Sequence, residues 1–445
     1  MAKKLSRREF IGATAMATAG FTIVPRHVLG GQGYKAPSDT INFGCVGIDG
    51  KGATDIDGIS SENIAALCEV DLARGIETRK KYPKANQYQD FRKMLDKEKG
   101  LDAITISTPD HTHAVIAMAA MQRGLHVFVQ KPLTKTVYEA RKLAEAAKKY
   151  NVITQMGNQG HAGEGARLVN EWIQDGAIGD VTEIHAWTNR PIWGQGEIER
   201  PEEIPSVPTE LDWNLWVGPA AHRPYHPDYH PFAWRGWRDF GTGALGDMGA
   251  HILDQPFWAL DLGDPKTIHA SSTRFSNESF PLASEVTWMI NGKKGKPDIK
   301  LVWRDGGILP PRPEELEPGR KMGSDGGGVI YYGINGNLMH SVYGEQPRLF
   351  PETSMQAYKR PEKSIPRSPG IYEEWIEAIK NGSKSTTDFE YSAKLTELML
   401  LGNVAILAQE HNTILEWDAE QFKFTNLDEA NELLHYQYSP GWNLD

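Results

Sequence analysis

The sequence holds a lysine and a histidine in settings where a side chain can handle protons. Lys131 lies in a Gln-Lys-Pro turn (residues 130–132) that follows an apolar stretch. Asp247 and His251 are four residues apart where the pattern is helical, so they lie on one helical face. An imidazole beside a carboxylate is the arrangement needed to take a proton from a hydroxyl while hydride leaves the same carbon. A surface lysine, an exposed helix pair or a hydrogen-bonded core histidine are the alternatives.

A glycine-rich loop lies well before these residues in the chain. An apolar run leads into GIDGKG (residues 47–52), and a second apolar run ends in Asp71, 19 residues beyond Gly52. This order is typical of a dinucleotide-binding βαβ unit, in which the glycines let a diphosphate approach the positive end of a helix. A carboxylate at Asp71 would hold the ribose hydroxyls. Glycine-rich turns are common, however, and this one carries Asp49 where the middle glycine is expected.

Strands and helical stretches alternate up to about residue 158. The turn TPDHTH (residues 108–113) and the turn at Lys131 both follow predicted parallel strands, whose carboxyl ends bind ligands in open α/β sheets. The predicted cofactor-binding residues are Gly47, Asp49, Gly50, Lys51, Gly52, Asp71, Arg74, Thr108, Pro109, His111, His113, Gln130, Lys131, Asn158 and Gln159. Asp71 would repel a 2′-phosphate, which favours NAD, and Arg74 nearby keeps NADP as the less favoured alternative.

Beyond residue 160 the pattern changes to short alternating strands separated by long loops rich in Trp, Pro and Gly. Such alternation predicts a largely antiparallel sheet with one buried face. Tryptophans and tyrosines gather in residues 213–237, where their rings could stack on a sugar or fill core volume. The predicted substrate-binding residues are Lys131, His161, Arg190, Trp193, Trp234, Arg235, Trp237, Asp247 and His251.

The predicted fold class is α/β, in two domains. Residues 38–158 would form an N-terminal Rossmann dinucleotide-binding domain, and residues 159–445 an α+β domain with an open, largely antiparallel sheet, for substrate binding and oligomerisation. Its C-terminal helices could pack back on the first domain. The histidine pairs 111/113 and 226/230 lack cysteine or carboxylate partners at a recognisable spacing, so no metal site is predicted.

Four motifs, in this order, resemble the Gfo/Idh/MocA family (glucose–fructose oxidoreductase, inositol dehydrogenase, MocA). They are the loop 47–52, the turn 108–113, the turn 130–132 and DMGAH (residues 247–251). The resemblance covers roughly residues 38–440 and implies that Lys131, Asp247 and His251 form a catalytic triad, with Lys131 reaching the nicotinamide and the substrate hydroxyl. It also implies a carbohydrate substrate and a homodimer or homotetramer. The family usually has Glu where this chain has Gln130, which leaves the pKa of Lys131 open.

The N-terminus reads MAKKLSRREFIGATAMATAGFTIVP and resembles a twin-arginine export signal. Its apolar part is too short to span a bilayer, and a frayed amphipathic helix is the alternative. We expect residues 1–34 to be this signal and the protein to be periplasmic, with no membrane insertion after signal removal. Because free NAD is absent there, the cofactor would be tightly bound. A net charge of −10 argues against nucleic-acid partners.

Three functions fit these residues. The leading one is an NAD-dependent oxidoreductase that transfers a hydride between the hydroxyl carbon of a sugar, sugar alcohol or glycoside and nicotinamide. The alternative is a redox-neutral glycosidase, in which transient oxidation at C3 acidifies the C2 hydrogen and permits elimination of the aglycone. Retention of Lys131 favours the first. A non-enzymatic sugar- or nucleotide-binding protein is the third, supported only by Asp49 and Gln130.

Overall fold

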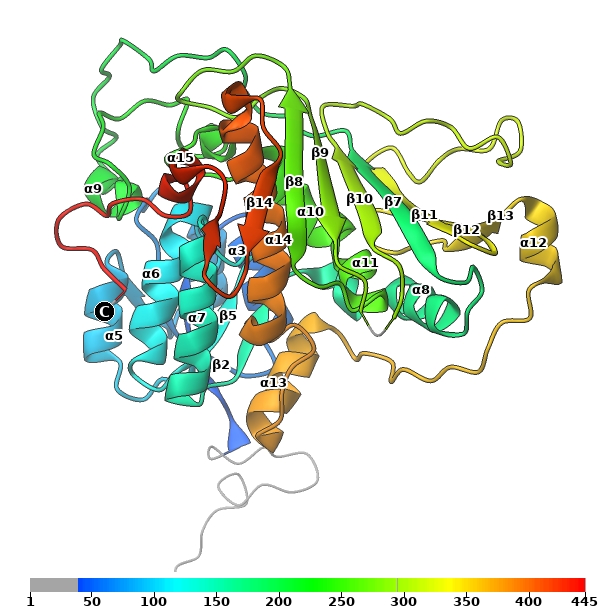
Figure 1. Cartoon of the computed structure of the whole chain (residues 1–445). Coiled ribbons are helices and arrows are strands. Elements are labelled where there is room, and N and C mark those ends of the chain that lie inside the picture. Colours follow the sequence, from blue (N-terminus) through cyan, green and yellow to red (C-terminus); the bar gives the residue numbers. More distant parts are fainter. Residues whose placement is uncertain (1–38, 294, 445) are drawn as a thin grey trace, which may run out of the picture.

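The computed structural model describes residues 39–293 and 295–444, so the predicted signal segment lies outside the described residues. The first domain is a parallel six-stranded sheet in the order β3-β2-β1-β4-β5-β6 (Figure 1). Its strands are β1 (Asn42–Val46), β2 (Asn63–Cys68), β3 (Asn86–Tyr88), β4 (Ala103–Ile106), β5 (His126–Val129) and β6 (Thr154–Met156). The helices are α3 (Lys51–Gly58), α4 (Ile76–Lys81), α5 (Phe91–Lys97), α6 (Asp110–Met121) and α7 (Val137–Tyr150). This order confirms the predicted Rossmann domain.

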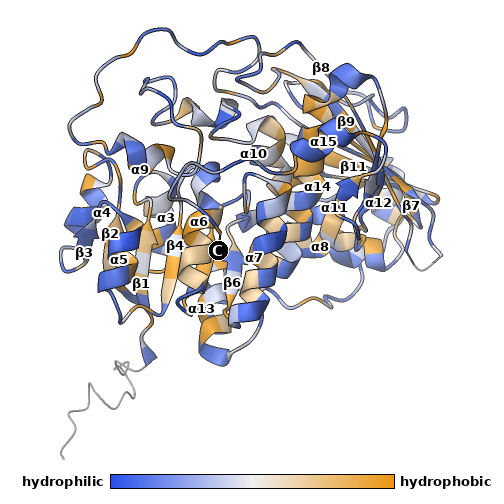
Figure 2. Cartoon of the chain, turned by 60° about the vertical axis from the view of Figure 1, so that its left-hand side comes forward, coloured by the Kyte–Doolittle hydropathy of each residue, from blue (hydrophilic) through white to orange (hydrophobic). Residues whose placement is uncertain are grey.

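The central strands form because their residues are apolar on both faces of the sheet. Every residue of β4 is buried, as is all of β1 except Asn42, and Figure 2 shows β1 and β4 as a hydrophobic layer between helices. Helix α7 begins with a capping box, in which Thr136 and Glu139 bond each other's backbone N–H. The carboxyl ends of these strands are therefore held in place by a buried sheet and a capped helix.

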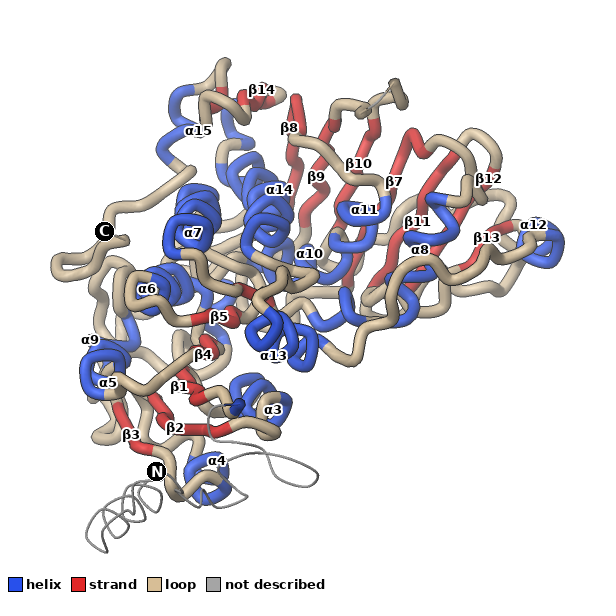
Figure 3. Tube along the Cα trace, turned by 90° about the horizontal axis from the view of Figure 1, so that it is seen from below, coloured by secondary structure: helices blue, strands red, loops and turns tan. Residues whose placement is uncertain are grey.

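The second domain is built on a nine-stranded sheet in the order β13-β12-β11-β7-β10-β9-β8-β14-β15. Its strands are β7 (Val181–Thr188), β8 (Pro265–Ser272), β9 (Ser284–Ile290), β10 (Ile299–Arg304), β11 (Gly327–Gly333), β12 (Gly336–Ser341), β13 (Arg348–Phe350), β14 (Leu415–Asp418) and β15 (Lys423–Phe424). All neighbours are antiparallel except β7 and β10, which confirms the predicted sheet type. Figure 3 shows helices α8 (Glu164–Gln174), α11 (Asp254–Ala259) and α14 (Phe389–Leu407) along one face of this sheet.

The remaining helical elements are short, except for α10 and α13. They are η2 (Gln159–Ala162), α9 (Trp213–Val217), η3 (Ala233–Gly236), α10 (Gly243–Ile252), α12 (Glu352–Ala357), α13 (Ile371–Asn381), η4 (Gln409–His411) and α15 (Asp428–Glu432). Helix α13 returns to the first domain, where Ile371 and Trp375 share a hydrophobic core with Phe43 and Phe128. No helix in the described ranges is long and apolar enough to cross a membrane.

A long segment between β7 and α10, residues 189–242, lies over the carboxyl ends of the first domain's strands; we name it the cover segment. It is attached to the end of β2 by main-chain bonds, from Asp212 N to Val70 O (2.9 Å) and from Leu72 N to Glu210 O (3.0 Å). It has its own small core of aromatic residues, namely Trp213, Trp216, Tyr229, Trp237 and Phe240. Most of the predicted aromatic cluster therefore fills core volume.

Candidate active site

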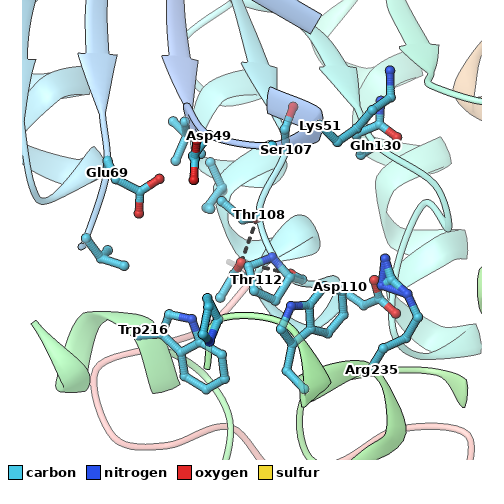
Figure 4. A pocket seen from close by; sticks show the side chains of 18 of the residues that line it. Asp49, Lys51, Glu69, Ser107, Thr108, Asp110, Thr112, Gln130, Trp216 and Arg235 are labelled. Atoms are coloured by element: carbon cyan, nitrogen blue, oxygen red, sulfur yellow. Dashed lines mark hydrogen bonds between the residues drawn. The ribbon is translucent and has the colours of Figure 1, made fainter. Parts of the chain in front are cut away.

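A cavity of about 570 Å³ lies between the first domain, the cover segment and helix α10. Figure 4 shows Asp49 and Glu69 reaching it from the Rossmann strands, and Trp216 and Arg235 reaching it from the opposite side. Fifteen of the predicted site residues line this cavity: Gly47, Asp49, Gly50, Lys51, Arg74, Thr108, Pro109, Gln130, Lys131, Gln159, Arg190, Trp234, Arg235, Asp247 and His251. The structure thus brings residues from both predicted sets into one site.

The structure places eight other predicted residues away from the cavity lining: Gly52, Asp71, His111, His113, Asn158, His161, Trp193 and Trp237. Gly52 has a packing role, since a Cβ there would lie 2.0 Å from the carbonyl oxygen of Gly47. The carboxylate of Asp71 pairs with His230 at 2.8 Å, on the cover segment. Asn158 is buried with both side-chain polar atoms unpartnered among the described residues.

The predicted histidines outside the cavity all have internal partners. His111 contacts the carbonyl oxygens of Phe240 (3.1 Å) and Trp216 (2.9 Å), so it fastens the cover segment to α6. Burial lowers the pKa of His111 to about 3. His161 lies 3.0 Å from the carboxylate of Asp254 and stacks on a tryptophan ring. These rings hold the fold together.

The two tryptophans are likewise held by internal bonds. The indole N–H of Trp193 donates to Gln195 at 2.7 Å, and that of Trp237 donates to the carbonyl of Asp228 at 2.9 Å. Trp193 still contributes indirectly, because the guanidinium of Arg235 lies 5.6 Å from its ring centroid.

The dinucleotide half of the cavity is formed by the loop between β1 and α3. Gly50 has φ of 55°, and a Cβ built on it meets no atom within 4 Å, so the loop has open space at the start of α3. Asp49 pairs with Arg74 at 2.6 Å, and both residues line the cavity. The first turn of α3 has no side-chain cap. The amide of Gly52 donates to the carbonyl of Asp49 at 2.9 Å, while the amides of Lys51 and Ala53 have no acceptor among the described residues and could bind a diphosphate. These features fit a dinucleotide.

Glu69, which the sequence pattern did not single out, is a carboxylate at the end of β2 that lines this half of the cavity. It follows β2 directly, and its side chain accepts hydrogen bonds from the backbone N–H groups of Ile48 and Asp71, both at 3.2 Å. Burial raises the pKa of Glu69. The position directly after the predicted second strand points to Glu69, whereas the distance from the glycine loop points to Asp71. Other cavity residues that were missed are Asp90, Phe91, Asp110, Thr112, Trp216, His230, Phe232, Tyr343 and Trp442.

The opposite half of the cavity holds Lys131, Asp247 and His251. Lys131 Nζ donates to Asp247 Oδ1 at 2.8 Å and to the Asp247 carbonyl at 2.9 Å. Arg235 Nε lies 2.9 Å from the same Oδ1. Burial lowers the pKa of Lys131 and Asp247 opposes that shift. Burial alone would raise the pKa of Asp247, but Lys131 and Arg235 hold it well below its usual range.

His251 lines the cavity one helical turn after Asp247, but the expected pairing of these two side chains is absent among the hydrogen bonds of the described residues. Asp247 is engaged by Lys131 and Arg235 instead. His251 Nδ1 is buried and has no partner in the described part of the chain. Burial and then Lys131 hold the pKa of His251 well below its ordinary value, so the ring is neutral. A neutral imidazole can accept a proton.

No group of three or more metal-binding side chains occurs in residues 39–293 or 295–444. What the cavity does offer is a neutral base, a charged lysine held by a carboxylate, and a helix N-terminus open to a diphosphate. Together these can remove a proton from a hydroxyl group and stabilise the oxygen left behind.

Comparison with known proteins agrees with this geometry. Residues 41–158 match the NAD-binding Rossmann fold of an oxidoreductase family, and residues 177–279 match the C-terminal alpha/beta domain of the same family. A levoglucosan dehydrogenase of Pseudarthrobacter phenanthrenivorans is 25% identical over 189 residues, 42% of this chain and 40% of that protein. A glycosyl hydrolase family 109 protein of Shewanella pealeana is 27% identical over 228 residues, 44% of this chain and 49% of that protein.

This chain spans about half or less of the length of these two relatives. A solved structure of levoglucosan dehydrogenase with NADH and levoglucosan superposes with a TM-score of 0.57 at 16% identity. That superposition covers 85% of this chain and 99% of the other, so it shows a shared fold.

Proposed function

The chain carries both domains of the Gfo/Idh/MocA oxidoreductase family, and we propose that it is an enzyme of that kind, transferring a hydride between the hydroxyl carbon of a sugar, sugar alcohol or glycoside and nicotinamide. The observation that carries the proposal is the placement of Lys131, His251 and the Gly50 loop on one cavity. The relatives named as sugar dehydrogenases support the substrate class. Glu69, to which we assign the ribose, supports NAD rather than NADP, since a carboxylate there would repel a 2′-phosphate.

Each residue of the reaction site has its own role in this proposed hydride transfer. Lys131 donates a hydrogen bond to the reacting oxygen and stabilises negative charge as it develops there. His251, neutral because it is buried beside cations, accepts the hydroxyl proton. Asp247 keeps Lys131 charged and fixes the position of its ammonium group. NAD, when bound, supplies the acceptor for the hydride.

We also propose that the protein is exported by the twin-arginine route and works in the periplasm. The Arg7-Arg8 pair followed by a short apolar stretch supports this. Retention of one NAD through many turnovers would then be required, because an exported enzyme has no soluble pool from which to replace it.

A redox-neutral glycosidase is the second candidate, supported by the similarity to glycosyl hydrolase family 109 proteins. The test is one assay of the mature protein with added NAD and a panel of free sugars and nitrophenyl glycosides, following NADH absorbance and aglycone release together. NADH formation without aglycone release supports the dehydrogenase. Aglycone release without net NADH supports the glycosidase, and neither signal across the panel contradicts both.

A further inference from the structure

Lys131, Asp247 and His251 are here called the reaction centre. Two arginines beside it have guanidinium N–H groups that bond no acceptor among the described residues. Arg235 forms an ion pair with Asp247 through Nε, while its terminal amino groups have no hydrogen-bond acceptor among the described residues. Its planar group lies 4.2 Å from the ring centroid of Trp234 and 5.6 Å from that of Trp193. Rings on which a guanidinium stacks restrict its orientation, so the donors of Arg235 are held ready rather than ordered by the ligand.

Arg190 is the second of these arginines. It lines the same cavity, and its side chain bonds only the amide oxygen of Asn189, at 2.5 Å. No carboxylate lies within ion-pair distance of it in the described part of the chain. Tyr343 connects it to the reaction centre, because this ring lies 4.9 Å from the His251 ring and its hydroxyl interacts electrostatically with both Arg190 and Asp247.

The charges around the reaction centre do not balance. Three cations face this half of the cavity, Lys131, Arg190 and Arg235. Two carboxylates oppose them: Asp247, and Asp110, which is buried and accepts a hydrogen bond from Thr242 at 2.7 Å. Asp247 pairs with both Lys131 and Arg235, and Lys51, which also acts on His251, pairs with Asp55 at 2.8 Å. Arg190 is therefore the cation on this side of the cavity that no carboxylate pairs with among the described residues. A positive charge without a partner in a partly dry cavity is unfavourable, and a ligand with one negative charge would relieve it.

We propose that the substrate is an acidic sugar, whose carboxylate is bound by Arg190 and Arg235 while its ring hydroxyl faces Lys131 and His251. A guanidinium binds a carboxylate through two parallel hydrogen bonds, which gives orientation as well as affinity. A carboxylate brings one negative charge to the one unpaired arginine, whereas a phosphate carries close to two charges at neutral pH. This inference rests on the proposed function for the hydroxyl chemistry, but the anion site rests on the charges alone.

The first experiment measures binding to the NAD-loaded protein by calorimetry. D-Glucuronate and D-galacturonate are each compared with their parent hexose and with the hexose 6-phosphate. The uronates are expected to bind at least about tenfold more tightly than the hexoses, which corresponds to about 1.4 kcal/mol. Arg190→Gln is expected to remove most of that preference. Arg200→Gln is the matched control, because Arg200 is an exposed residue of the cover segment that pairs with Glu278 at 2.9 Å outside the cavity.

The outcomes separate this inference from the proposed function. Hexoses binding as tightly as uronates, phosphates binding more tightly than uronates, or no uronate binding at millimolar concentration each overturn the acidic-sugar inference. Uronate binding that depends on Arg190, without NADH formation from any sugar, upholds the anion site and contradicts the dehydrogenase. Oxidation of hexoses without any preference for uronates upholds the dehydrogenase and overturns the anion site.

Discussion

Gln130 donates its side-chain amide to the carboxylate of Asp55, with Nε2 at 3.0 and 2.9 Å from the two oxygens. Asp55 is fully buried on α3, and the hydroxyls of Ser107 (2.6 Å) and Tyr372 (2.7 Å) also donate to it. Since the amide nitrogen is directed to Asp55, the amide oxygen of Gln130 is directed to the backbone N–H of Lys131, 3.4 Å away. A glutamate, usual at this position in the family, would place a second carboxylate against Asp55.

Gln130→Glu is therefore expected to lower the free energy of unfolding by about 2–3 kcal/mol, because two buried carboxylates would face each other. The double variant Asp55→Asn, Gln130→Glu exchanges amide and carboxylate and should recover at least half of the loss. Urea unfolding of both variants, with and without NAD, measures this. A double variant no more stable than Gln130→Glu would show that the pair does not act as a unit.

Asp247→Asn is expected to lower kcat by about 10²- to 10³-fold, since it removes the anion that holds the Lys131 ammonium in place. Asp247 raises the pKa of Lys131, so its loss lowers that pKa, and the alkaline limb of the kcat profile should move to lower pH. In a Lys131→Ala background the same substitution should add little, because its partner is already gone. Fully additive losses in kcat would contradict a role through Lys131.

The pH profile of kcat/KM reports on His251. Its pKa lies well below the ordinary value of 6.5, so the neutral ring persists under mildly acidic conditions and the acid limb should lie below pH 6.5. Arg235 is one of the cations that lower this pKa; Arg235→Gln should raise it and shift the acid limb to higher pH. The position of the limb, rather than the height of the profile, is the measurement, because Arg235 also contacts Asp247. A wild-type limb at or above pH 6.5 would contradict this assignment.

Glu69→Gln is expected to weaken NAD binding by at least about tenfold and to improve NADP relative to NAD, because it removes the carboxylate at the ribose position. Asp71→Asn is the matched comparison, two residues away, and should change NAD affinity less, since Asp71 does not line the cavity and its carboxylate pairs with His230. Titration of the cofactor-free protein with each dinucleotide measures both. A larger loss of affinity in Asp71→Asn would restore Asp71 as the ribose ligand.

The sequence predicts the first domain well because the signals there are local. Parallel strands buried on both faces form continuous apolar runs such as β4, and the glycine loop lies between two of them. The second domain is predicted less completely, since β14 and β15 are only four and two residues long and carry too little pattern to identify.

The partners of site residues are harder to predict, because long-range contacts decide them. Asp71 is a reasonable ribose ligand until the cover segment brings His230, 159 residues later, within 2.8 Å of it. Asp247 and His251 share a helical face as the spacing predicts, yet Arg235 and Lys131 arrive from other elements and take the carboxylate. The spacing of residues along one helix does not show which side chains from other elements will pair with them.

The cover segment contributes residues to both halves of the cavity. Trp216 and His230 border the dinucleotide half of the cavity, while Arg190 and Arg235 border the reaction centre, and all four belong to one stretch of chain. If the first ligand to bind orders that stretch, the second has less entropy to remove. We therefore expect the binding of cofactor and substrate to be linked, each raising the affinity for the other by the same factor.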